Sequence, residues 1–105
     1  MAAYVIAQME VHDPAKYREY ASKVGQTASA YGGRILAAND AEVKEGEPPY
    51  RRTIIGEFSS SKDLRAWYQS EAYQEILPLR LESTTSILFF VEGFSLPPID
   101  KEPQG

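Results

Sequence analysis

The sequence predicts a single α+β domain with the element order β-α-β-β-α-β, the ferredoxin-like arrangement. The chain has 105 residues, which is enough for one hydrophobic core and too few for two. Strand-like and helix-like segments alternate in this order between turn signals. Two split βαβ units of this kind form a four-stranded antiparallel sheet with two helices on one face. We expect the domain to span residues 1–95 and the proline-containing residues 96–105 to form a flexible C-terminal tail.

The first strand and the first helix are predicted from residues 4–31. Residues 4–11 are β-branched and aromatic enough for a strand. Asp13 suits the N-cap of a helix and Pro14 its first turn, and Gly32-Gly33 suits a left-handed helix end. The segment between them carries one apolar stripe at helical spacing. The stripe consists of Tyr17, Tyr20, Ala21, Val24, Ala28 and Tyr31.

Two further strands are predicted before the second helix. The chain is extended from Arg34 to about Val43, and Asn39-Asp40 indicates a bulge or bend because both residues are poor strand formers. A proline-containing loop follows. Residues 50–58 then return as the third strand.

The second helical segment is predicted to begin at Ser60, which resembles an N-cap. Ser70 indicates the cap of a second helical piece. Pro78 cannot continue a regular helix, so we expect the segment to be bent or split. Residues 86–94 form the strongest predicted strand of the chain.

Several strands lack the alternation of a half-exposed sheet. Residues 87–91 are apolar without interruption, and residues 5–7 and 54–55 alternate poorly. Both faces of the sheet are therefore expected to be buried, one by helices and the other by a second copy of the chain. The sequence predicts a homodimer that packs sheet to sheet.

Composition excludes several classes of function. The net charge of −4 argues against a non-specific nucleic-acid binder. The absence of cysteine excludes disulfides and thiolate metal sites and fits a reducing cytoplasm. The apolar N-terminus is predicted to be a strand and not a signal peptide, and no apolar run is long enough to span a bilayer. We expect a cytoplasmic protein without membrane contact.

With these elements placed, the chain resembles the family called domain of unknown function 1330, in the dimeric α/β-barrel superfamily. The resemblance covers roughly residues 4–94 and depends on the order of several short motifs. They are Tyr4-Val5-Ile6-Ala7, Asp13-Pro14 with Tyr17 and Tyr20, Tyr31-Gly32-Gly33-Arg34, Arg51-Arg52 with Glu57-Phe58, Ala66-Trp67-Tyr68 with Ser70 and Tyr73, and Val91-Glu92-Gly93.

The resemblance implies a ferredoxin-like fold and a dimeric barrel, with a pocket as the usual site. It does not imply one activity, because relatives in the superfamily include cofactor-independent monooxygenases, small isomerases and haem proteins. One departure concerns the segment Ala38-Asn39-Asp40, where the family usually carries an Arg-Gly-Gly-like kink. A site carried over from the family at that edge is not expected here.

His12 is the only histidine of the chain. A general base or a metal ligand is conceivable beside Asp13, but a surface or capping role is the expected one. A metal site needs three or four converging ligands, and their spacing is missing around His12. Neither a metal nor haem nor any other cofactor is predicted.

The aromatic residues of the helices suggest a pocket between sheet and helices. The aromatic set either lines this pocket or fills the core, and buried hydroxyls need partners in both cases. It consists of Tyr17, Tyr20, Trp67, Tyr68 and Tyr73. Arg34 and Arg52 are the best candidates to hold an anion. Their alternative role is an ion pair with a glutamate of a neighbouring strand, for which Glu10, Glu57 and Glu92 are available.

Two hypotheses follow from the sequence. The first is a small enzyme that performs proton transfer or cofactor-free oxidation on a small organic molecule, for which an anionic group is one option. Its substrate would contact Tyr17, Trp67, Tyr68 and Tyr73, with Arg34 or Arg52 at the anionic group. The second is a non-catalytic homodimeric module that binds a small ligand or another protein. An enclosed pocket with ordered hydroxyls favours the first, and a filled core favours the second.

Overall fold

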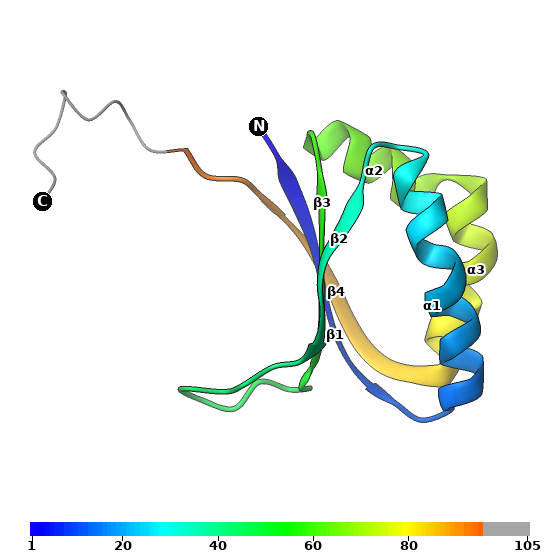
Figure 1. Ribbon diagram of the computed structural model, residues 1–105, viewed down its shortest axis with the longest axis vertical. Helices are drawn as coiled ribbons and strands as arrows, with labels where there is room; N and C mark the ends of the chain where they lie inside the picture. Colours follow the sequence, from blue (N-terminus) through cyan, green and yellow to red (C-terminus); the bar gives the residue numbers. More distant parts are fainter. Residues whose placement is uncertain (96–105) are drawn as a thin grey trace, which may run out of the picture.

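A computed structural model of the chain describes residues 1–95, and within them it contains a four-stranded antiparallel sheet with three helices on one face (Figure 1). The strand order across the sheet is β2-β3-β1-β4. In chain order the elements are β1 (Ala3–Val11), α1 (Pro14–Ser29), β2 (Arg34–Asp40), β3 (Arg52–Phe58), α2 (Ser61–Gln69), α3 (Glu71–Ser83) and β4 (Thr84–Glu92). The predicted ferredoxin-like fold is confirmed, and its second helical segment consists of two helices. The predicted tail, residues 96–105, lies outside the described residues.

Capping side chains set the helix boundaries. Asp13 Oδ1 accepts a hydrogen bond from the Lys16 backbone N–H at 3.1 Å, and Ser60 Oγ accepts one from Asp63 at 3.1 Å. Ser70 Oγ accepts from the Tyr73 N–H at 3.2 Å while its own backbone is extended, so α2 ends and α3 begins there. The caps that the sequence predicts at these three positions are present.

Pro78 lies inside α3 and does not split it. We expected the second helical segment to bend or break near this proline, but the break is at Ser70. Pro78 is exposed. A proline there removes one backbone donor and costs least where water can reach the helix. Within residues 1–95 no helix is long and apolar enough to cross a bilayer.

The bulge in β2 is at Leu36 and not at Asn39-Asp40. Ile35 pairs with Gly56 and Ala37 with Ile55, which leaves Leu36 as the extra residue. Asn39 and Asp40 pair regularly with β3, and the strand ends at Asp40 before the predicted Val43.

Helices cover one face of the sheet and leave the other face open (Figure 1). On the helix side, alternate residues of β1 are buried against a core that includes Tyr20, Phe58, Leu64, Trp67 and Tyr73. Figure 1 shows no helix on the opposite side. That face leaves Ile87, Phe89 and Val91 of β4 exposed by 40%, 44% and 44%. The predicted second apolar face therefore exists.

Candidate functional site: a cationic cavity between sheet and helices

A cavity of about 150 Å³ lies between the sheet and the helices. All four strands contribute to its floor, and α1, α2 and α3 contribute to its roof. Most of its lining is apolar. Among these residues are Val5, Ala7, Val24, Ile54, Phe58 and Leu88.

The cavity reaches the surface between α1 and the edge strand β2. Ile35 lies on the helix side of the sheet, as its pairing with the buried Gly56 shows, yet it is 41% exposed. Ala21 of α1 and Ala38 of β2 also line the cavity and are exposed. These residues form the mouth, because β2 is the outermost strand and is the least covered by the helices.

Two arginines project into this apolar space. Arg80, in the last turn of α3, is 4% exposed and donates from Nη1 to Ser86 Oγ at 2.7 Å. Its guanidinium carbon lies 6.0 Å from the centre of the Tyr20 ring. Arg52 of β3 lies in the same way over Tyr17, at 5.8 Å. These are cation–π contacts, which weakly stabilise each guanidinium.

The Nε atoms of Arg52 and Arg80 are buried and have no hydrogen-bond partner among residues 1–95. Buried donors are normally satisfied, so two orphaned guanidinium N–H groups in one cavity require an explanation. An unseen acceptor that occupies the cavity would provide it.

The sheet register places Arg52 and the partner of Arg80, Ser86, at the same position along the strands. Met9 of β1 pairs with Arg52 of β3 on one side and with Ser86 of β4 on the other. Because Arg80 is bonded to Ser86, the two guanidinium groups flank Met9. The cavity is therefore polarised, with cations at the Met9 end and Phe58 and Trp67 at the other.

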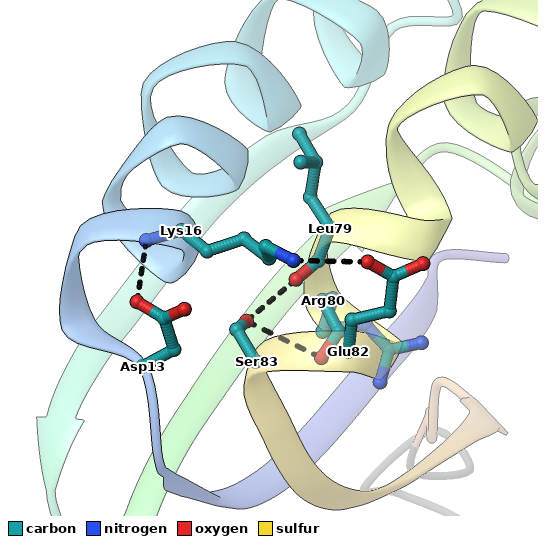
Figure 2. A network of polar contacts seen from close by, with 6 residues as sticks. All are labelled: Asp13, Lys16, Leu79, Arg80, Glu82 and Ser83. Atoms are coloured by element: carbon teal, nitrogen blue, oxygen red, sulfur yellow. Dashed lines mark hydrogen bonds and ion pairs between the residues drawn. The ribbon is translucent and has the colours of Figure 1, made fainter.

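Contacts at the end of α3 fix the backbone at Arg80 and engage the nearby carboxylate of Glu82 with another residue (Figure 2). The Ser83 hydroxyl donates to the carbonyls of Leu79 and Arg80, which closes the helix. Glu82, two residues from Arg80, pairs with Lys16 of α1 at 3.0 Å. No ion pair of Arg80 is present within residues 1–95.

Tyr20 and Tyr73 form a buried phenol pair beside Arg80, with 2.9 Å between their oxygens. Burial, and secondarily the Tyr73 hydroxyl, raises the pKa of Tyr20 far above its usual value, and Arg80 only partly opposes this. Each phenol has one O–H group, and only one of the two groups is used in the hydrogen bond between the oxygens. Both phenol oxygens also interact with the guanidinium of Arg80.

The predicted site residues divide into two groups. Tyr17, Arg52 and Trp67 line the cavity, and Arg34 reaches its rim. Tyr68 and Tyr73 do not line it. Tyr73 is fully buried behind Tyr20, and Tyr68 packs between Tyr73 and Phe90 with ring centres 5.4 and 5.8 Å apart.

The guanidinium of Arg34 is engaged elsewhere. It donates to Glu57 Oε1 from Nε at 3.2 Å and from Nη2 at 3.0 Å, and Tyr4 donates to Oε2 of the same carboxylate at 3.1 Å. Arg34 and Glu57 are cross-strand partners. Of its two predicted roles, the ion pair with a neighbouring strand is the one that the structure contains.

His12 is exposed and its Nε2 contacts the Thr85 hydroxyl. Among residues 1–95 no group of three or more histidines, aspartates and glutamates is placed to hold a metal ion. The surface role expected for His12 agrees with this position.

Arg80 is the residue that sequence reasoning missed. A signal for it exists in the helical spacing. Tyr73, Leu77 and Arg80 stand at positions i, i+4 and i+7 of α3, and all three are buried. An arginine in the apolar stripe of a helix indicates either a structural contact or a ligand site.

The fold and the cavity together define a class, a ferredoxin-like domain with a small ligand-sized space between sheet and helices. The family model of the domain of unknown function DUF1330 matches residues 2–94. The chain belongs to this family. No curated protein matches it significantly.

Solved structures of the same fold include three informative relatives. A protein of unknown function from Rhodopseudomonas palustris is 14% identical, with a TM-score of 0.72 over 90% of this chain and 84% of that one. SnoaB, a cofactor-independent oxygenase from Streptomyces nogalater, is 11% identical, with a TM-score of 0.66 over 92% and 97%. A dimeric ferredoxin-like protein of unknown function from Jannaschia sp. CCS1 is 12% identical, with a TM-score of 0.67 over 89% and 100%. At these identities the likeness concerns the fold.

Proposed function

We propose that the protein is a homodimer that binds a small, largely apolar organic molecule in the cavity between sheet and helices. One observation carries this proposal: an apolar cavity of about 150 Å³ that opens between α1 and β2. Well-packed cores contain few voids larger than a water molecule. An apolar cavity of this size in another protein takes up benzene, so the ligand has the dimensions of about one aromatic ring.

Binding without covalent chemistry is the function that the lining supports best. The described residues around the cavity include no histidine, aspartate or glutamate. Those side chains are the common general bases near neutral pH. The lining instead offers the guanidinium groups of Arg52 and Arg80, with Arg34 at the rim, and phenols, which recognise a ligand but do not remove a proton from it.

Cofactor-independent oxidation is the second candidate. SnoaB, which shares the fold, is described as a cofactor-independent oxygenase. Arg52 and Arg80 favour it, because cations in an apolar cavity lower the pKa of a bound phenol or enol. Oxygen uptake by the protein with a panel of small phenols tests this candidate, and an uptake rate equal to that of the phenols alone would exclude it.

The homodimer is supported by the uncovered sheet face. Ile87, Phe89 and Val91 form an apolar surface there with Ile6 and Ile55 of the neighbouring strands. A monomer rarely leaves so continuous an apolar surface in water. Relatives of the same fold are described as dimeric.

Trp67 provides a direct test of ligand binding. It is the only tryptophan of the chain and lines the cavity, so its fluorescence reports on occupancy. We expect toluene to change this fluorescence in a saturable way. Ala21→Leu, which places a larger side chain in the mouth, should weaken toluene binding at least tenfold.

Ala15→Leu is the matched control, because Ala15 is exposed on the same helix and does not line the cavity. It should bind toluene like the wild type. Saturable binding that is equal in both variants would place the ligand elsewhere and contradict the proposal, as would no binding at all.

A further inference from the structure

We propose that the cavity selects a monocarboxylate, whose carboxylate group binds Arg80 and Arg52 and whose apolar body lies toward Phe58 and Trp67. This inference rests on the proposed binding function and adds the chemical class of the ligand. It gives Arg80 the leading role in anion recognition.

The charge of Arg80 has no carboxylate to balance it. The residue is 4% exposed, so its guanidinium has lost most of its water. Its protein contacts are the Ser86 hydroxyl, the face of Tyr20 and the phenol oxygens of Tyr20 and Tyr73, and none of these groups supplies a negative charge near neutral pH. Burying a charge without a counter-charge is costly. A ligand carboxylate would provide both the missing charge and the acceptor for Nε.

Arg52 also lacks an ion pair within residues 1–95. Its nearest carboxylate in the sheet register is Asp40, its cross-strand partner on β2. Asp40 and Glu10 line an open groove outside the cavity that Arg52 also borders. Neither forms an ion pair with Arg52 in the described part of the chain. Both arginines are therefore available to the same anion.

The spacing of the strands allows both arginines to reach one carboxylate. Arg52 and Ser86 sit on the strands that flank β1, so their backbones are about 10 Å apart, twice the strand spacing. Arg80 reaches Ser86, and Arg52 extends from the other side. A carboxylate above Met9 has two oxygens with about four acceptor positions, which suits donors that approach from both sides.

The shape of the cavity limits the rest of the ligand. Beyond Arg52 and Arg80 the lining is apolar apart from Arg34 at the rim, with Val24 and Ala28 of α1 above and Phe58 and Trp67 at the end. The guanidinium of Arg34 is paired with Glu57, so a second charge or a hydrated phosphate would find no free partner there. An aryl carboxylate or a short branched aliphatic carboxylate fits both ends.

Selectivity of the wild-type protein is the first test. Benzoate, benzamide and toluene share one ring and differ in the polar group. We expect benzoate to bind at least tenfold more tightly than either neutral compound, measured by Trp67 fluorescence and calorimetry. Phenylphosphonate, a larger anion, should bind more weakly than benzoate.

Arg80→Met is the second test, because it keeps most of the side-chain volume and removes the charge. It should weaken benzoate binding at least tenfold and leave toluene binding within about twofold. Arg65→Met, on the exposed side of α2 and outside the cavity, is the control and should change neither. A purely structural role of Arg80 would weaken both ligands together.

The outcomes separate the two proposals. If neither toluene nor benzoate binds the wild type, the binding function fails. If benzamide or toluene binds as tightly as benzoate, the carboxylate inference fails while the binding function stands. If Arg80→Met does not fold, Arg52→Met and Arg80→Lys replace it, and unchanged benzoate affinity in both would overturn the inference.

Discussion

Trp67 connects the core with the cavity. Its ring centre lies 4.2 Å from that of Tyr73 and 5.3 Å from that of Phe58, and its indole N–H donates to the Thr27 hydroxyl at 3.0 Å. Trp67→Ala should therefore destabilise the fold by about 3–5 kcal/mol, the usual cost of removing a buried aromatic side chain. Chemical denaturation followed by circular dichroism measures this. A fully stable Trp67→Ala protein that no longer binds toluene would show that Trp67 serves the cavity alone.

Tyr20 gives a prediction on pH. Burial raises the pKa of its phenol above the unfolded value of 10.0, so the folded state keeps this proton when the unfolded state loses it. The contribution of Tyr20 is then fully present below pH 10 and is lost as the pH rises above it, by up to about 1.4 kcal/mol per pH unit. Tyr20→Phe removes this loss.

We therefore expect the stability of Tyr20→Phe relative to the wild type to improve by about 1 kcal/mol between pH 9 and pH 11. Denaturation midpoints at several pH values check this. Parallel pH curves for the two proteins would contradict the raised pKa of Tyr20.

The sequence predicts that aromatic residues and arginines line the cavity, but it predicts only some of the individual residues that do so. Tyr17, Arg52 and Trp67 could be predicted from aromatic and basic residues on elements that pack together. The sequence alone does not show that Arg80, and not Arg34, keeps its guanidinium available to an anion. That depends on which arginine forms an ion pair with a carboxylate in the folded chain. Arg34 meets Glu57 across β2 and β3, whereas Glu82, which follows Arg80 closely in the chain, is taken by Lys16.

At the scale of elements, Gly33 links the end of α1 to the core. A Cβ at this position would lie 2.4 Å from Cε2 and Cζ of Phe58, which is 2% exposed, so the ring would have to shift. Gly33→Ala should therefore destabilise the protein by about 1–3 kcal/mol through overpacking.

Gly25→Ala is the matched substitution within α1, where a Cβ would have no neighbour within 4 Å. It should stabilise the protein by about 0.4–1 kcal/mol, because alanine restricts the unfolded chain and favours the helix. Thermal unfolding of both variants checks the pair. Equal effects of the two substitutions would contradict the close contact of Gly33 with Phe58.

Local signals predicted where the helices begin. The caps at Asp13, Ser60 and Ser70 depend on a side chain and a backbone N–H three residues later, which the sequence contains in full. The bulge at Leu36 depends instead on how β2 pairs with β3, which no local pattern encodes.

At the scale of the whole molecule, the open sheet face allows a specific test of dimerisation. Phe89 lies on this face, whereas Phe90 points to the helix side and packs on Tyr68. Phe89→Asp should give a folded monomer, because it places a charge in the proposed interface. Light scattering measures the mass. Leu81→Asp, an exposed apolar position on α3, is the control and should remain a dimer.

The uninterrupted apolar run of β4 predicted that both sheet faces are apolar. In the structure, alternate residues of this run face the helices and the open side. Leu88 and Phe90 face the helices, and Ile87, Phe89 and Val91 face outward. Which phenylalanine belongs to which face depends on the register with β1, so the sequence alone left Phe90 unassigned.

A crystal structure of the protein with benzoate would show whether the cavity binds a monocarboxylate through Arg80 and Arg52. We expect ligand density in the cavity, with the carboxylate within hydrogen-bond distance of Arg80 and Arg52 and the ring toward Phe58 and Trp67. A cavity that stays empty at saturating benzoate, or a benzoate whose carboxylate points to the mouth between α1 and β2, would contradict it.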